Sequence, residues 1–230
     1  EWLPSEDRFD GGLTALCDTI RGHGLVPGLW LELEVMGESC PLVQEWPKEC
    51  FFQRRGRPVI FRGRYQLDFR HPMVRAHANE VLERIVDQYG VGYIEIDYNI
   101  DSSMGTDVDA DSLGDGLLKH NRAYLQWLES ARERFPDLLL ENCSSGGMRT
   151  DYALLSLHDI HSCTDQTSVE KMARLAPMGA IGVVPEQLGV WCYPVVSDDD
   201  ESVILNCVNS FVGRMMISGE IAYLSSESRE

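Results

Sequence analysis

Short apolar runs alternate with amphipathic segments along most of this chain. A recurrence of apolar residues every three to four positions predicts a helix, and a short apolar run bounded by glycine or proline predicts a buried strand. Residues 10–24 are predicted to form a helix that closes at Gly22 and Gly24, and residues 26–34 a strand. The same pattern predicts further helices over 72–89, 117–135, 154–155, 169–175 and 197–217, and further strands over 93–97, 138–143, 159–164, 180–184 and 221–224.

The order of these elements indicates an α/β fold. Alternating strands and helices predict a parallel sheet, interrupted by an excursion over 35–70 with a hairpin at Arg62-Gly63 and by an Asp-rich loop over 101–116. Polar clusters at the carboxyl ends of the strands favour a (β/α)8 TIM barrel over a doubly wound sheet. The six predicted strands are fewer than the eight of a closed barrel. We therefore expect residues 1–230 to be one partial catalytic barrel domain, holding about strands 2 to 7.

Composition narrows the classes of function. A net charge of -17 argues against a nucleic-acid partner and an anionic membrane surface, because both require clustered Lys and Arg. The sequence contains no run of ~18 apolar residues, so it predicts no membrane-spanning helix. The seven cysteines are scattered and lack Cys-x-x-Cys spacing, which predicts a reducing compartment, the cytoplasm, rather than a disulfide framework or a structural zinc site. Because the chain begins at Glu1 without Met, we expect it to be a piece of a longer protein. The sequence leaves open whether that protein carries an export signal and whether it forms a homo-oligomer.

Three strings carry candidate chemistry at predicted strand ends. They are Tyr93-Ile-Glu-Ile-Asp97-Tyr-Asn99, Glu141-Asn-Cys-Ser-Ser-Gly-Gly-Met-Arg149 and His161-Ser-Cys-Thr-Asp165-Gln-Thr167. Alternate residues of a strand share one face, so Glu95, Asp97 and Asn99 are expected to point the same way. Buried carboxylates are costly unless they are paired or used, and their convergence predicts an active site.

Blander interpretations stay open at several positions. Glu32 and Glu34 fit a structural salt-bridge network as well as substrate contact, and Trp30, Trp191 and Tyr98 fit core packing as well as sugar stacking. Cys143 and Cys163 are typical of small buried side chains. The acidic run 198–201 is typical of the charges that stabilise a helix N-terminus. A different class, a metal-dependent lyase or isomerase, would use an acidic cage of Glu32, Glu95, Asp97, Glu141 and His161. A catalytically silent carbohydrate-binding barrel is a further alternative.

The motifs resemble, in order and spacing, the catalytic barrel of glycoside hydrolase family 36, the α-galactosidases (melibiases). They are Gly28-Leu-Trp-Leu-Glu32-Leu-Glu34, Leu67-Asp68, and the strings that contain Asp97, Cys143 and Asp165. The resemblance implies retaining hydrolysis of α-galactosides on a (β/α)8 barrel, with a glycoside or oligosaccharide as substrate and with no cofactor or metal. It implies that Asp97 is the nucleophile, Asp165 the general acid/base, Arg64 a site residue, and Cys143 to Gly147 the segment that touches sugar hydroxyls. The expected substrate-binding set is Trp30, Glu32, Arg64, Glu95, Asn99, Cys143, Ser145, Gly146, Gly147 and Arg149.

The sequence departs from the family pattern beside the expected nucleophile. The family lysine two residues before it is Glu95 here, so a donor is replaced by an acceptor of opposite charge. Its tryptophan is Ile96, and the arginine after the asparagine is Ile100. A second anion beside Asp97 calls for a compensating cation, for which Arg64 and Arg149 are the candidates. The exact sugar and aglycone are therefore left open.

Overall fold

The computed structural model describes residues 2–5, 7–100 and 105–229, which form two compact units, 1–140 and 141–230. In the first unit, β1 (Gly28–Leu31) pairs in parallel with β7 (Tyr93–Ile96), with Gly28 opposite Tyr93 and Leu31 opposite Ile96. This pairing sets the carboxyl ends of the two strands side by side. Residues 32 and 97, which follow those ends, are the acids predicted from sequence.

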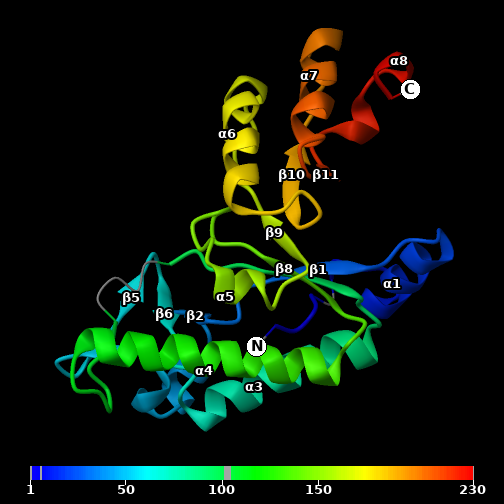
Figure 1. Cartoon of the computed structure of the whole chain (residues 1–230). Coiled ribbons are helices and arrows are strands. Elements are labelled where there is room, and N and C mark those ends of the chain that lie inside the picture. Colours follow the sequence, from blue (N-terminus) through cyan, green and yellow to red (C-terminus); the bar gives the residue numbers. More distant parts are fainter. Residues whose placement is uncertain (1, 6, 101–104, 230) are drawn as a thin grey trace. The chain divides into compact units, whose positions relative to one another are not determined.

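Helices α1 (Gly12–Gly22), α3 (Pro72–Glu83) and α4 (Leu113–Arg134) belong to this unit, and Figure 1 shows α3 and α4 lying side by side. Pro72 suits the first turn of α3, where its missing N–H is not needed, and the His71 ring accepts a bond from the Met73 N–H. A π-helical turn, η2 (Arg84–Gln88), extends α3, close to the predicted end at residue 89. The indole of Trp127 donates to Asn79 over 2.8 Å and ties α4 to α3.

The excursion forms two short antiparallel sheets. One contains β2 (Val35–Gly37), β6 (Arg64–Gln66) and β5 (Ile60–Phe61), and the other β3 (Gln53–Arg54) and β4 (Arg57–Pro58); α2 (Leu42–Glu45) and the 3-10 turn η1 (Lys48–Cys50) lie between β2 and β3 in sequence. The predicted hairpin at Arg62-Gly63 is confirmed, with φ of 49° and 75° at its two turn residues. Positive φ at both positions is the mark of a type I′ turn, for which glycine is well suited. Arg55-Gly56 forms a second hairpin of the same kind that the sequence reading missed.

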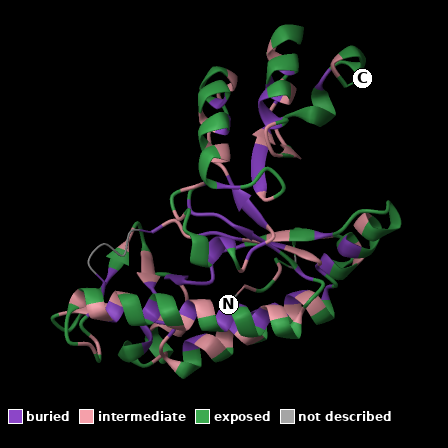
Figure 2. Cartoon of the chain, viewed as in Figure 1, coloured by how far each residue is buried: buried purple, intermediate pink, exposed green. Residues whose placement is uncertain are grey.

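In the second unit the end of β8 (Leu139–Asn142) pairs in parallel with β9 (Ile160–Ser162), which pairs with β10 (Leu188–Cys192), which pairs with β11 (Arg214–Ile217). Helices α5 (Tyr152–Leu155), α6 (Val169–Gly182) and α7 (Asp200–Ser210) intervene, and η3 (Ile221–Tyr223) and α8 (Ser226–Arg229) follow. Buried side chains of α5, α6 and β10 form its core; Figure 2 shows the buried and exposed faces of these elements. The α/β class with parallel strands is confirmed.

Two predicted strands are wrong. Residues 180–182 complete α6, and the strand lies later, at Leu188–Cys192. Gly189 weakens the strand signal of that segment, and a Cβ there would lie 2.5 Å from the Met216 sulfur on β11, so a larger residue would have to displace the Met216 side chain. The predicted last helix stops at Ser210 rather than residue 217, and 214–217 is the strand predicted at 221–224. Short apolar runs do not distinguish a helix from a buried strand, which explains both errors.

Two smaller predictions also have outcomes. The first strand ends at Leu31, and residues 33–34 turn into β2, so the predicted extent of 26–34 was too long. The acidic run 198–201 does lie at a helix N-terminus, where the Asp199 carboxylate accepts from the Ser202 N–H over 2.9 Å. In the described part of the chain, no helix combines the length and the apolar character needed to cross a bilayer.

Candidate active site

Asp97 follows β7 directly, and its N–H donates to the Leu31 carbonyl over 2.8 Å, which continues the pairing of β7 with β1. Its side chain is 5% exposed and accepts three hydrogen bonds. Trp30 Nε1 donates to Oδ2 over 3.1 Å, the Tyr98 N–H donates to Oδ1 over 2.7 Å, and Asn99 Nδ2 donates to Oδ2. Donors on both oxygens fix the orientation of the carboxylate.

Glu32 lies beside Asp97 and is held by two contacts. Arg64 Nε lies 3.2 Å from Oε2, and the Asn99 N–H donates to Oε1 over 3.1 Å. Arg64 Nη1 also donates to the Asn99 carbonyl over 3.5 Å. Burial raises the pKa of Glu32, and the Arg64 guanidinium and Asn99 oppose that rise. The expected site residues Trp30, Glu32, Arg64 and Asn99 therefore form one connected group around Asp97.

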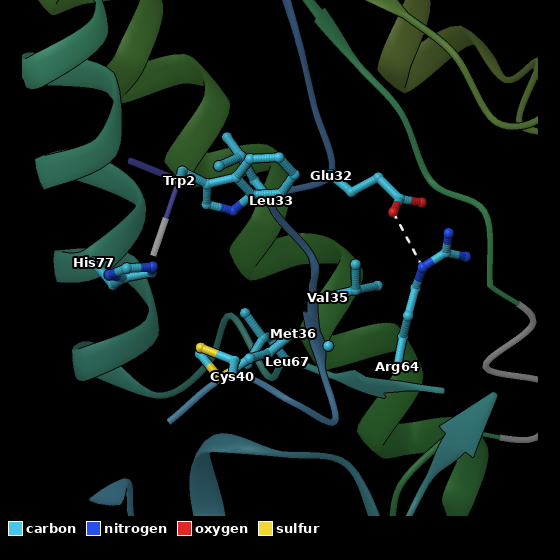
Figure 3. Close-up of a pocket in the computed structure, with 10 residues that line it drawn as sticks. Trp2, Glu32, Leu33, Val35, Met36, Cys40, Arg64, Leu67 and His77 are labelled. Atoms are coloured by element: carbon cyan, nitrogen blue, oxygen red, sulfur yellow. Dashed lines mark ion pairs between the residues drawn. The ribbon is translucent and has the colours of Figure 1, made fainter. Parts of the chain in front are cut away.

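A cavity of about 280 Å³ opens next to this group (Figure 3). Glu32 and Arg64 lie on one side of it, and their ion pair is the dashed line in the figure. Trp2, Cys40 and His77 also line it and were not singled out from the sequence. None of these three belongs to a polar cluster at a strand end, so the sequence held no signal for them. The cavity gives a small ligand access to the Glu32 carboxylate.

Glu34 belongs to a separate, structural network, which resolves one of the open alternatives. Its Oε2 lies 3.1 Å from His120 Nε2, in the buried face of α4. His120 Nδ1 accepts from the Phe69 N–H over 3.1 Å and lies 3.8 Å from Asp68, whose carboxylate is paired with Arg70. Burial opposes ionisation of Asp68, but the nearby His120 and the hydrogen-bonded Arg70 lower its pKa overall. Glu34 thus anchors α4, whereas Glu32 lies at the candidate site.

The three aromatic candidates, Trp30, Tyr98 and Trp191, differ in their surroundings. Trp30 is 44% exposed and packs edge-on against Trp2, with ring centroids 6.1 Å apart. The Tyr98 hydroxyl donates to Gln66 Oε1 over 2.7 Å, a contact that fixes the ring to the antiparallel sheet. In the second unit, Trp191 stacks on Tyr193 with centroids 5.8 Å apart. Trp30 keeps the exposed surface that a sugar contact would need.

In the second unit, the segment Cys143–Arg149 folds into a tight loop after β8. Cys143 is buried, and its sulfur accepts from the Gly146 N–H over 3.2 Å. Ser145 and Gly146 both have positive φ, of 45° and 81°. The Asn142 side chain donates to the Arg149 carbonyl over 3.2 Å and holds the far end of the loop. Ser145 is exposed and Arg149 half-buried.

His161 holds this loop against β9. Its Nδ1 lies 2.9 Å from Asn142 Nδ2, and its Nε2 lies 2.7 Å from the Thr150 hydroxyl, which donates to the Gly147 carbonyl. Burial lowers the pKa of His161 and so favours the neutral ring. Both ring nitrogens are engaged, and a role as a metal ligand would require breaking one of these contacts. Thr150 was missed from the sequence because a single exposed threonine carries no pattern.

Asp165 lies three residues after β9 and is exposed. Gly146 forms an isolated antiparallel bridge with Thr164, directly before it. Cys163 is half-buried near α6, where its sulfur lies 3.8 Å from the Leu175 carbonyl, and burial raises its pKa. Asp165 is thus presented by a loop whose backbone is paired with the glycine-containing loop.

A model of the Melibiase family matches residues 1–194. The chain belongs to the melibiase family. It is 30% identical over 176 residues to the bifunctional α-galactosidase/sucrose kinase AgaSK of Mediterraneibacter gnavus, a match that covers 76% of this chain and 18% of that protein. The family predicted from the motifs is confirmed.

Solved structures of this family have the same fold. The galactosidase domain of AgaSK matches 100% of the chain and 31% of its own with a TM-score of 0.85 at 25% identity. The GH36 α-galactosidase AgaA from Geobacillus stearothermophilus, in complex with stachyose, matches 100% of the chain and 33% of its own with a TM-score of 0.85 at 18% identity. The chain spans about a fifth of the length of its curated relatives and about a third of the solved chains.

Proposed function

We propose that this chain carries the catalytic centre of a retaining glycoside hydrolase that acts on α-galactosides. Asp97 is the nucleophile and Asp165 the general acid/base in this proposal. The substrate class is an oligosaccharide or glycoside, as in the stachyose complex of the relative AgaA. The parallel strands of both units are assigned to part of a (β/α)8 barrel, a fold that presents chemistry at the carboxyl ends of its strands.

The observation that carries the proposal is the setting of Asp97 in a chain of the melibiase family. A buried carboxylate that directly follows a strand and accepts bonds from Trp30, Tyr98 and Asn99 is held in one orientation. A fixed orientation is what attack on an anomeric carbon requires. Asp165 is exposed on a loop three residues after β9, a setting in which a general acid can reach a leaving group.

The mechanism follows from these two roles. Asp97 attacks the anomeric carbon while protonated Asp165 gives its proton to the leaving oxygen, so a glycosyl-enzyme forms with inversion. Asp165, now ionised, takes a proton from water, and that water displaces Asp97 with a second inversion. The released sugar keeps its α configuration.

The acidic metal cage has less support. Glu32 is paired with Arg64, and the ring of His161 is bonded to Asn142 and Thr150. Divalent ions favour carboxylates that are free to coordinate, and two of the five cage residues are committed elsewhere.

Azide trapping tests both assignments in the full-length protein that carries this sequence. With an activated aryl α-galactoside, Asp97→Gly should yield the β-galactosyl azide, because azide enters from the face that the nucleophile has vacated. Asp165→Ala should yield the α-azide, because azide then attacks the intermediate on Asp97. Asp137→Ala, a change at an exposed aspartate after α4, is the matched control and should behave as the parent. An α-azide from Asp97→Gly, or unchanged turnover in either variant, would sink the assignment.

A further inference from the structure

The approach between Gly146 and the segment that carries Asp165 is closer than any side chain allows. A Cβ on Gly146 would lie 2.4 Å from Thr164 Cα and 2.7 Å from the backbone nitrogen of Asp165. Real Cβ atoms do not come within 3.0 Å of other atoms, and ordinary contact begins at 3.4 Å. The colliding atoms belong to the backbone, so a rotamer change cannot relieve the contact.

Gly147 repeats this arrangement one residue later. Its Cβ would lie 2.6 Å from the Cys163 carbonyl oxygen. The two glycines therefore bring the loop after β8 onto the backbone of residues 163–165, and the Gly146–Thr164 bridge joins the two segments. The backbone nitrogen of Asp165 is part of this contact, and the Asp165 side chain follows directly after it.

Hydrogen bonds hold the loop after β8 in place. Asn142 donates to the Arg149 carbonyl, and the Thr150 hydroxyl contacts both the Gly147 carbonyl, over 2.6 Å, and His161. The Gly146 N–H also donates to the buried Cys143 sulfur. A side chain added at Gly146 would therefore displace Thr164 and Asp165 as much as the loop.

We propose that Gly146 is a positioning residue for Asp165: its lack of a side chain lets the loop after β8 hold the backbone of the general acid/base in place. This rests on the proposed function, because it assigns a task to Asp165, and it adds a role beyond the expected contact of this segment with sugar. Ordinary contact in Gly146→Ala needs about 1 Å of extra separation from Thr164, and a misplacement of about 1 Å can cost on the order of 100-fold in rate.

Leaving-group dependence tests the proposal. A poor alkyl leaving group needs the proton of Asp165, whereas dinitrophenolate leaves without it. In Gly146→Ala, kcat/KM should fall on the order of 100-fold for methyl α-galactoside but less than about 10-fold for dinitrophenyl α-galactoside. Azide should raise kcat of the variant on the dinitrophenyl substrate, because it needs no general base. The control Gly182→Ala, where a Cβ meets nothing within 4 Å, should match the parent on both substrates.

Asp165→Ala, measured in parallel, separates the possible failures. Equal losses on both substrates in Asp165→Ala would refute the proposed function, and the positioning role with it. Selective loss in Asp165→Ala with equal losses in Gly146→Ala would overturn the positioning role alone. If Gly146→Ala does not fold, Thr150→Ala decides, because it removes the hydroxyl contacts of the loop and adds no atom that could collide. It should show the same selectivity at about three- to tenfold, and a uniform loss there refutes the role of the loop.

Discussion

Replacing Arg64 by methionine should destabilise the protein through the buried Glu32 carboxylate. Methionine keeps much of the apolar stem and removes the guanidinium that lies 3.2 Å from Glu32. Glu32 is 4% exposed, and once Arg64 is removed its described contacts are those with the uncharged Asn99. The variant therefore leaves a buried anion without its cation.

The size of the effect follows from burial. Breaking a fully buried ion pair costs about 3–5 kcal/mol, whereas an exposed pair is worth about 1 kcal/mol or less. The Arg64 side chain is 33% exposed, so water replaces part of what it supplies. We expect a loss of about 2 kcal/mol at neutral pH.

The loss should depend on pH in a defined direction. Burial raises the folded-state pKa of Glu32 above its ordinary value of 4.5, and Arg64 opposes that shift. A group with a raised folded pKa contributes stability that is present below its unfolded pKa and is lost as pH rises through the folded pKa. Arg64→Met should raise the pKa of Glu32 further, so the variant should approach the parent below about pH 4.5 and fall behind as pH increases.

Urea unfolding followed by tryptophan fluorescence at several pH values measures this. Arg57→Met, at an exposed arginine on β4, controls for loss of a positive charge and should change stability by less than about 0.5 kcal/mol. In a Glu32→Gln background, Arg64→Met should cost less than about 0.5 kcal/mol, because no buried charge is left unpaired. The same loss at pH 4.5 and pH 7.5, or an undiminished loss beside Gln at position 32, would refute the reasoning.

Three further predictions concern other positions. Trp30→Phe keeps an aromatic ring but removes a hydrogen-bond donor to Asp97, and it should lower kcat/KM about fivefold, because a half-exposed hydrogen bond is worth about 1 kcal/mol. An unchanged kcat/KM would mean that water fully replaces the indole N–H. Glu95→Lys restores the donor found in the family and should shift the kcat/KM ratio toward plain galactosides over other glycosides; no shift would make Glu95 structural. The Cys192 and Cys207 sulfurs lie 3.7 Å apart, so hydrogen peroxide should join them, seen as a loss of about 2 Da that Cys207→Ser abolishes; added oxygen without that loss would contradict it.

Local patterns in the sequence determined the family and much of the architecture. The motifs around Asp97, Cys143 and Asp165 identified the melibiase family, and the alternation of elements gave the parallel strands. The turn at Arg62-Gly63 and the Asp199 cap were predictable because each depends on the conformational preferences of a few neighbouring residues. These features need no information about distant parts of the chain.

The tertiary structure decided what depends on distant partners. Glu32 and Glu34 are two residues apart and alike in sequence, yet Arg64 pairs with one and His120 with the other. Segment 188–192 is a strand because β9 and β11 pack against it, in spite of Gly189. Burial, ion pairing and close packing are set by residues far away along the chain. A sequence pattern can therefore propose which acids matter, but only the folded contacts show which of them is held for chemistry and which for structure.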